Sequence, residues 1–242
     1  MRKIAVIDGD SICFLCSKDT LEESKANVDS ILADIFEETG STHYFLFLSS
    51  GPYFRHQVNP EYKANRPPTT LLFIKELRKH LKDVYNALIY EQVEADDMVA
   101  YVMGNFDDLG DKICCGNDKD VTYQVPGNHL NYRTFDQQTT TVVDAIRFLY
   151  TQVLTGDSSD NIKGIPGIGP KKAEKILGKD DWHNLHTATL SAYYEHYDLA
   201  AGQAVFEFQK NFRQVYLLRR QEDFTREVGY IPELPEPFPI NK

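Results

Sequence analysis

Carboxylates gather in four short motifs of the 242-residue chain, at spacings that could hold metal ions. The densest motif, residues 94–97, places three acids within four positions. Such crowding is unfavourable unless a cation joins the carboxylates, because like charges repel at short range. The eight acids that we assign to a metal site are Asp8, Glu94, Asp96, Asp97, Asp118, Asp120, Asp157 and Asp160.

The type of ligand indicates which metal these motifs would bind. Carboxylate oxygens suit hard divalent cations, so the sequence predicts Mg²⁺ or Mn²⁺. Two such ions about 4 Å apart can activate water and stabilise an in-line phosphate displacement. Each motif also has an ordinary explanation. The acids at 94–97 could cap a helix, and those at 118–120 or 157–160 could belong to polar loops. The coincidence of four motifs favours the metal site.

The acids follow segments with strand character, which would bring them together. Apolar, β-branched runs predict strands at 3–7, 43–48, 87–93, 112–115 and 129–135. Helical spacing of apolar residues predicts helices at 21–38, 71–84, 95–103 and 142–154. This alternation predicts an α/β fold with a doubly wound, mostly parallel, PIN-like sheet. In such sheets ligands bind beyond the carboxyl ends of the strands, where these acids lie.

The pattern changes along the chain and indicates three parts. Residues 1–154 are expected to form the α/β core, with an arch segment at about 51–84. Residues 155–224 have no convincing strand and are expected to form short helices. Residues 225–242 are rich in proline, which predicts an extended tail that could dock on a partner.

Glycines and lysines at 163–175 predict a helix-hairpin-helix motif. The glycines permit a tight turn and close backbone approach, and a helix N-terminus can face a phosphate. Such a hairpin grips a duplex backbone without reading bases, and its carbonyls could hold K⁺. The residues assigned to DNA binding here are Lys163, Gly164, Gly167, Gly169, Lys171, Lys172 and Lys175.

The segment 55–66 interleaves basic and aromatic residues, and Arg55 is its first cation. Basic residues track a nucleic-acid backbone and aromatic rings stack on bases, so this pattern favours single-stranded nucleic acid. An ordinary solvated loop is the alternative.

The composition is compatible with these assignments. The net charge is −10, which argues against nucleic acid when taken alone. However, the eight acids of the motifs account for most of that excess. The four cysteines are expected to be reduced and buried, since no second pair completes a zinc site. Without a membrane span or signal peptide, a cytoplasmic protein is expected, in the host cytoplasm if a phage encodes it.

Taken together, the motifs resemble the 5′ nuclease (flap endonuclease) family, which includes the N-terminal domain of bacterial DNA polymerase I and stand-alone phage exonucleases. The resemblance covers roughly residues 3–178. It implies that the eight acids bind the metal ions. It also implies catalytic contacts from Tyr62, Lys63 and Arg66 at the base of an arch. There the lysine and arginine would contact the scissile phosphate, and the tyrosine would stack on a base.

The sequence departs from this family at one position. An aspartate usually ends the second strand, whereas Ser49 or Ser50 stands there in this chain. A serine hydroxyl brings no charge, so weaker affinity for one metal ion is expected. Asp10 could compensate in part.

The resemblance implies a 5′–3′ exonuclease and flap endonuclease that hydrolyses 5′-flap, nicked or gapped DNA in replication or primer removal. RNA–DNA hybrids are a further expected substrate, and a monomer is expected. Two rival functions stay open. One is a structure-selective DNA-binding protein with weakened catalysis. The other is a PIN-like ribonuclease, which would share the acids but would not need the hairpin.

Overall fold

The computed structural model describes residues 2–178, 184–197 and 202–240. These residues form two compact units, each made of segments that are discontinuous in sequence. Unit 1 comprises Met1–Tyr53, Thr69–Thr140 and Leu217–Lys242, and unit 2 comprises Phe54–Pro68 and Thr141–Tyr216. The expected boundary at residue 154 therefore does not coincide with the division into compact units.

Unit 1 is built on a mostly parallel sheet. Within the described residues it has seven strands in the order β3-β2-β1-β4-β5-β6, with β9 also paired to β2. The parallel strands are β1 (Lys3–Asp8), β2 (His43–Leu48), β3 (Leu88–Ile89), β4 (Asp111–Gly116) and β5 (Gly127–Asn131). The antiparallel strands are β6 (Gln137–Thr140) and β9 (Phe238–Pro239). The predicted α/β fold with a mostly parallel sheet is confirmed.

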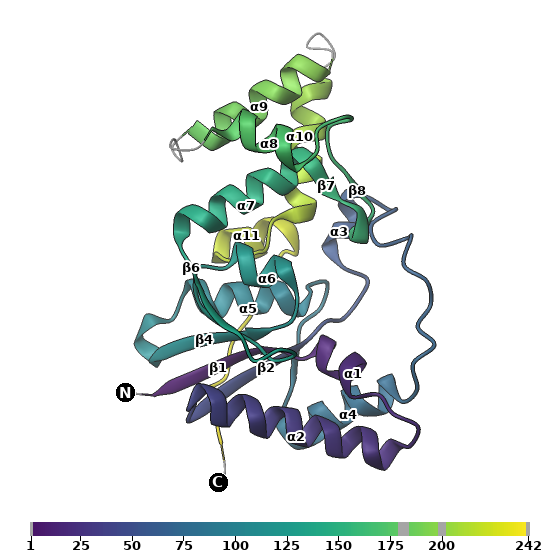
Figure 1. Cartoon of the computed structure of the whole chain (residues 1–242), viewed down its shortest axis with the longest axis vertical. Coiled ribbons are helices and arrows are strands. Elements are labelled where there is room, and N and C mark those ends of the chain that lie inside the picture. Colours follow the sequence, from purple (N-terminus) through teal and green to yellow (C-terminus); the bar gives the residue numbers. More distant parts are fainter. Residues whose placement is uncertain (1, 179–183, 198–201, 241–242) are drawn as a thin grey trace. The chain divides into compact units, whose positions relative to one another are not determined.

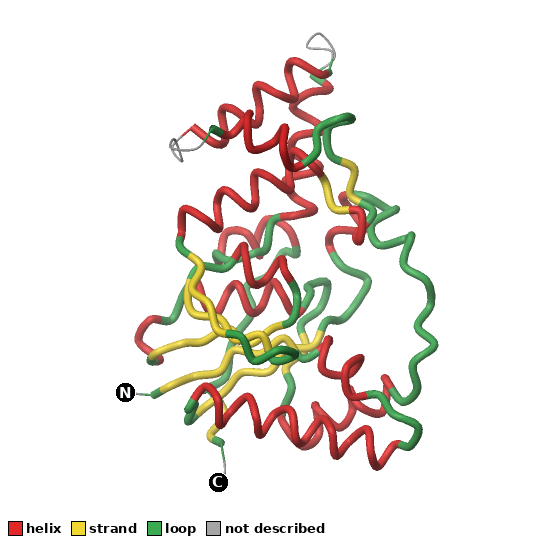
Figure 2. The backbone as a smooth tube through the Cα atoms, viewed as in Figure 1, coloured by secondary structure: helices red, strands yellow, loops and turns green. Residues whose placement is uncertain are grey.

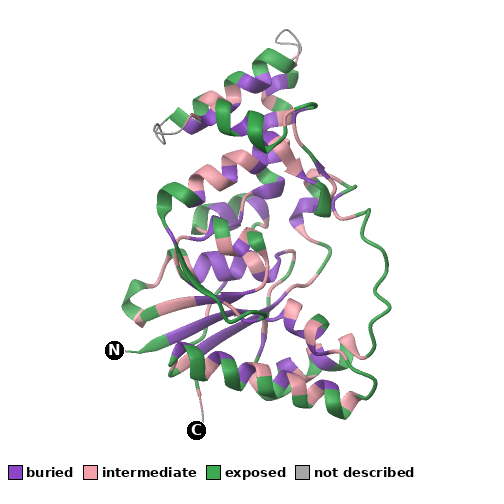
Figure 3. Cartoon of the chain, in the orientation of Figure 1, coloured by how far each residue is buried: buried purple, intermediate pink, exposed green. Residues whose placement is uncertain are grey.

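Helices cover both faces of this sheet (Figure 1). One face carries α1 (Asp10–Cys16), α2 (Leu21–Thr39) and α4 (Ile74–Tyr85), whose apolar side chains join those of β1 and β2 in one core cluster. The other face carries α5 (Ala95–Gly104) and α6 (Lys119–Gln124), and α11 (Gln221–Glu227) completes the unit. Because both faces are covered, β1 and β2 are almost wholly buried, as Figure 3 shows.

Unit 2 is mainly helical. Its helices are α3 (Phe54–Val58), α7 (Val142–Thr155), α8 (Pro170–Leu177), α9 (Leu185–His196) and α10 (Gln203–Val215). Two short strands, β7 (Gly156–Asp157) and β8 (Ile162–Lys163), form an antiparallel pair between α7 and α8. The expectation of no strand in this region was wrong, because the hairpin backbone closes on itself. Residues 179–183 and 198–201 of the expected helical region lie outside the described residues.

Several element boundaries differ from the predicted ones. The strand expected at 87–93 is limited to Leu88–Ile89, and the one expected at 129–135 is β5, which ends at Asn131. The segment at 51–68 contains α3, but most of the chain between α3 and α4 has no regular structure (Figure 2). The predicted tail begins within α11, and Phe238 of β9 pairs with Tyr44 of β2 in the same unit.

None of the helices in the described part of the chain combines the length and apolar character that crossing a bilayer requires.

Candidate active site

In unit 1 the predicted metal-site acids lie at the carboxyl edge of the sheet. Asp8 is the last residue of β1, and Asp118 follows the end of β4 by two residues. These strands are parallel neighbours, with Ile7 opposite Cys115. The carboxyl ends of both strands therefore point to the same edge, as the sequence predicted.

A buried tyrosine contacts the backbone of Asp8 and is affected by the charges of three acids. The Tyr132 hydroxyl donates a hydrogen bond of 2.8 Å to the backbone carbonyl of Asp8. Burial raises the pKa of Tyr132 well above its ordinary value, and the charges of Asp8, Asp96 and Asp10 raise it further. Asp8 and Asp96 also add to the effect of burial on the pKa of Cys114. Asp8 and Asp96 therefore act on the same two buried side chains.

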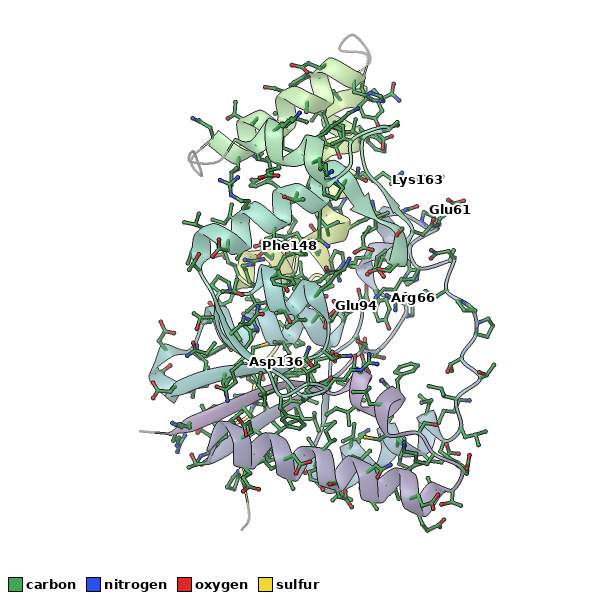
Figure 4. The ribbon with its side chains drawn as sticks, in the orientation of Figure 1. Glu61, Arg66, Glu94, Asp136, Phe148 and Lys163 are labelled. Atoms are coloured by element: carbon green, nitrogen blue, oxygen red, sulfur yellow. The ribbon has the colours of Figure 1, made fainter. Side chains whose placement is uncertain are left out.

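Glu94 and Asp97 have capping roles at the start of α5. The two residues form a capping box: the Glu94 side chain accepts the backbone N–H of Asp97, and the Asp97 side chain accepts the backbone N–H of Glu94. The Asp97 side chain accepts from the Glu94 amide at 3.1 Å and from the Leu218 amide at 3.0 Å, and it is fully buried. Figure 4 labels Glu94 at this helix start. The helix-capping alternative thus describes Asp97, whose two carboxylate oxygens both accept amides.

The third motif also begins a helix. Asp118 is the N-cap of α6, and its side chain accepts the Asp120 amide at 2.7 Å. Both residues are partly exposed. This placement suits a ligand that must reach a metal ion at the surface of the sheet edge.

The unit 1 acids are carboxylates at or near one sheet edge, and carboxylate oxygens are ligands that suit a hard divalent cation. Among the described residues, however, no group of three or more His, Cys, Asp or Glu side chains is arranged to hold a metal ion. The structure thus places the unit 1 acids on one edge without gathering three around a single point.

The fourth motif belongs to unit 2, in the turn between β7 and β8. Asp157 is buried, and its carboxylate accepts from the Ser159 amide at 2.8 Å and from the Ser159 hydroxyl. Asp160 is also buried, yet it has charged neighbours. The two acids share one turn, as their i and i+3 spacing suggested.

Asp160 contacts all three residues that the family resemblance assigned to catalysis. The Tyr62 hydroxyl donates to its Oδ2 at 3.0 Å, and Lys63 Nζ lies 3.8 Å from the same oxygen. Arg66 donates to Oδ1. Backbone contacts reinforce this junction, because the Lys63 amide donates to the Asp160 carbonyl at 2.9 Å. The structure thus brings the predicted arch-base residues and one predicted metal ligand into one cluster.

The Tyr62 ring is only 3% exposed in this cluster. His56 packs edge-on against it, and Lys63 Nζ lies 5.0 Å from its centroid. The expected stacking of this ring on a base would therefore require the ring to become exposed first.

The predicted DNA contact of Arg55 is at odds with the structure. This side chain is 2% exposed, and its guanidinium donates at 2.9 Å to the carbonyls of Gln214 and Tyr216. These carbonyls end α10, where the last helical carbonyls need partners outside the helix. Arg55 therefore caps the C-terminal end of α10. Its burial and its two carbonyl acceptors keep it away from a DNA phosphate.

The segment 163–175, for which the sequence predicts a helix-hairpin-helix, runs from the last residue of β8 through a glycine-rich turn into α8. A Cβ atom on Gly164 would lie 2.4 Å from the Gly156 nitrogen, so this crossing requires glycine. Gly167 has a φ of +78°, whereas Gly169 is the N-cap of α8 and faces open space. The four predicted lysines are all exposed: Lys163, Lys171, Lys172 and Lys175.

The sequence analysis missed Tyr132 and Arg78 at the carboxyl edge. Arg78 of α4 donates to the Asp10 carboxylate and to the Ser49 carbonyl. Asp10 is therefore paired within the protein rather than left to replace a missing aspartate. An arginine within an otherwise lysine-rich helix was the only signal available, and it is a weak one.

The sequence of the chain is similar to those of known nucleases. Residues 3–151 match the family model of the 5′-3′ exonuclease N-terminal resolvase-like domain. A flap endonuclease Xni of Shewanella sp. (strain W3-18-1) is 27% identical over 195 residues, which are 73% of this chain and 74% of that relative. DNA polymerase I of Rhizobium leguminosarum is 32% identical over 145 residues, covering 54% of this chain but 14% of the polymerase.

Solved structures show the same fold. A mutant of the T5 5′-exonuclease superposes with a TM-score of 0.65 at 18% identity, covering 90% of this chain and 89% of that one. The bacteriophage T5 D15 flap endonuclease, described as a complex with DNA and metal ions, gives a TM-score of 0.61 at 20% identity, with 88% and 99% covered.

Proposed function

Because the chain belongs to the 5′-3′ exonuclease family, we propose that it cleaves 5′-flap, nicked or gapped DNA at the carboxyl edge of its sheet. It is a structure-selective 5′ nuclease that hydrolyses phosphodiester bonds. The observation that carries this function is the placement of Asp8 at the carboxyl end of β1 and of Asp118 just beyond the carboxyl end of the adjacent parallel strand β4, inside the region that matches the family model.

A divalent cation, Mg²⁺ or Mn²⁺, is proposed as the cofactor. The solved relatives include the T5 5′-exonuclease with zinc and T5 D15 with metal ions. In unit 1 the proposed metal ligands are Asp8, Glu94, Asp96, Asp118 and Asp120, whereas Asp97 is occupied in capping α5. In unit 2 the proposed metal ligands are Asp157 and Asp160. When bound, such ions supply charge stabilisation at the phosphate and a nucleophile at neutral pH. The carboxylate donors support this assignment, and two ions remain the proposed number.

The chain's own cations would bind and orient the DNA phosphate. Lys63 and Arg66 are proposed to contact the scissile phosphate, since both carry charge next to a buried carboxylate. In the described structure that charge is directed to Asp160. A DNA phosphate would therefore compete with Asp160 for the same two side chains, and a cation at Asp160 would favour the exchange.

The hairpin is proposed to bind duplex DNA without reading its sequence. Its exposed lysines and the N-terminus of α8 present positive charge on one motif. A K⁺ ion at the hairpin, activity on RNA–DNA hybrids and a monomeric state complete the proposal.

A digestion experiment separates this function from its rivals. A 5′-flap DNA, a matched single-stranded RNA and a blunt duplex are incubated with Mg²⁺, Mn²⁺ or EDTA. We expect cleavage of the flap DNA near its branch point with either ion and none with EDTA. Binding without cleavage under all conditions would favour a structure-selective DNA-binding protein. Faster cleavage of the RNA would favour a ribonuclease.

A further inference from the structure

One arginine joins the start of α1, which follows β1, to the residue that follows β2 in unit 1. The Arg78 guanidinium donates from Nη1 to Asp10 Oδ1 and from Nη2 to the Ser49 carbonyl. The Asp10 Oδ2 atom accepts the Ser49 amide at 3.0 Å. This ring of contacts fixes both ends of the guanidinium, which a lysine could not match with its single ammonium group.

The same ring is connected to the predicted metal-site acids. The Asp10 amide donates to Asp8 Oδ1 at 3.0 Å, so the first residue of α1, which Arg78 holds, also orients the Asp8 carboxylate. The Ser49 hydroxyl accepts the Ala95 amide at 2.8 Å, which anchors the first turn of α5 next to Glu94. Arg78 therefore supports two of the acid motifs without being part of either.

The charge around Asp10 is less negative than that of a cluster of acids. Asp10 and Arg78 form an ion pair with side chains that are 23% and 30% exposed. Ser49, one of the two serines at the position where the family resemblance implied an acid, adds no charge. Burial raises the pKa of the nearby Cys13 thiol to about 12; the charge of Asp10 raises this pKa further, and the charge of Arg78 opposes the rise. Arg78 is linked to Asp8 through Asp10, which pairs with Arg78 and donates its amide to Asp8.

We propose that Arg78 is a positioning residue for the nuclease reaction. Its fixed positive charge next to Asp10 replaces part of the charge that a divalent cation would supply there. This inference rests on the proposed function, since it concerns the same carboxyl edge. It has two separable components. The charge of Arg78 lowers the affinity of the edge for divalent cations, and its forked geometry holds Asp8 and the start of α5 in place.

Metal binding without DNA tests the charge. Mn²⁺ is titrated calorimetrically into the wild-type protein, Arg78→Gln, Arg78→Lys and Lys82→Gln. Lys82 is exposed one turn further along α4, so its substitution changes the net charge equally and serves as the control. Arg78→Gln should bind Mn²⁺ about threefold to tenfold more tightly, because it leaves Asp10 without its counter-charge beside Asp8. Arg78→Lys and Lys82→Gln should stay within about twofold of the wild-type affinity.

Cleavage kinetics test the geometry. At saturating Mn²⁺ and 5′-flap DNA, Arg78→Gln should lower kcat by about tenfold or more with little change in KM, because Asp8 is misplaced. Arg78→Lys keeps the charge but loses the fork, so it should give an intermediate kcat despite near-normal Mn²⁺ affinity. Equal kcat values in all three proteins would overturn the positioning role.

The remaining outcomes also decide the matter. If Arg78→Gln fails to fold, Asp10→Asn replaces it, and the unpaired Arg78 charge should then weaken Mn²⁺ binding by about threefold or more. Unchanged Mn²⁺ affinity in whichever of these two variants folds, or a wild-type protein that binds no Mn²⁺, overturns the inference. A wild-type protein that binds Mn²⁺ but never cleaves flap DNA contradicts the proposed function, while the Mn²⁺ titration still reports on Arg78.

Discussion

The Tyr62 hydroxyl donates a hydrogen bond of 3.0 Å to the buried carboxylate of Asp160. This contact joins the segment before α4 to the turn between β7 and β8, within one compact unit. The two residues were assigned different roles from the sequence, one to a DNA base and the other to a metal ion. The contribution of the Tyr62–Asp160 contact to the free energy of unfolding can therefore be measured without an activity assay.

Tyr62→Phe should lower the free energy of unfolding by about 1.5 kcal/mol, since it removes a hydrogen bond to a charged acceptor and leaves the ring in place. Urea unfolding measures the change. Tyr194→Phe is the control, because Tyr194 is 38% exposed, and it should change stability by less than about 0.5 kcal/mol. Equal stability of the two variants would mean that the contact with Asp160 does not hold the junction.

Arg55→Met should destabilise the protein by about 3 kcal/mol, because it leaves the last carbonyls of α10 without donors in a buried place. Its affinity for flap DNA, measured in EDTA below the unfolding temperature, should remain within about twofold of the wild-type value. A normal melting temperature combined with much weaker DNA binding would show instead that Arg55 contacts DNA.

Lys171→Ala should show the opposite behaviour. The side chain is exposed on α8, so its loss should leave the melting temperature unchanged. DNA affinity should fall for every duplex sequence alike, and the slope of log affinity against log salt should shrink by about 1. Fluorescence anisotropy over a range of salt concentrations measures both quantities. An unchanged slope would exclude a phosphate contact at this lysine.

The buried thiols predict a loss of stability at alkaline pH. Burial raises the pKa of Cys16 from 9.0 to about 11. The folded protein therefore holds this proton more tightly than the unfolded chain, and stability falls as pH rises from 9 to 11. Cys16→Ala should remove part of this decline, about 1.4 kcal/mol per pH unit in that window. Urea unfolding of the wild-type protein and Cys16→Ala at several pH values measures this decline. An equal loss of stability in both proteins between pH 9 and 11 would contradict the prediction.

The sequence was sufficient for the central strands and for the acids that follow them. Runs such as residues 4–7 are buried on both faces, and a buried parallel strand needs a nearly continuous apolar run. The acids after such a run must lie at the carboxyl edge whatever the details of packing. Likewise, the hairpin glycines were predictable because Gly156 and Gly164 approach too closely for any side chain.

Edge strands and side-chain partners could not be predicted in the same way. β6 is polar and largely exposed, so its pairing with β5 leaves no apolar pattern, although Asn131 does accept the Arg133 amide in a recognisable turn. β9 pairs with a strand nearly 200 residues earlier. The burial of Arg55 and the pairing of Arg78 also depend on distant backbone carbonyls, which residue types alone do not reveal.

The comparison that tests the central proposal most directly uses an acid just beyond the carboxyl end of β4 and an acid at the amino end of the same strand. Asp118→Asn changes the carboxyl edge, and Asp111→Asn makes the same chemical change at the first residue of the strand. In a single-turnover assay with Mg²⁺ and 5′-flap DNA, Asp118→Asn should lose roughly 100-fold or more in rate, because even the outer partners of metal ligands commonly contribute 10–100-fold. Asp111→Asn should cleave at the wild-type rate. Near-normal cleavage by folded Asp118→Asn, or equal losses in both variants, would contradict a catalytic site at this edge.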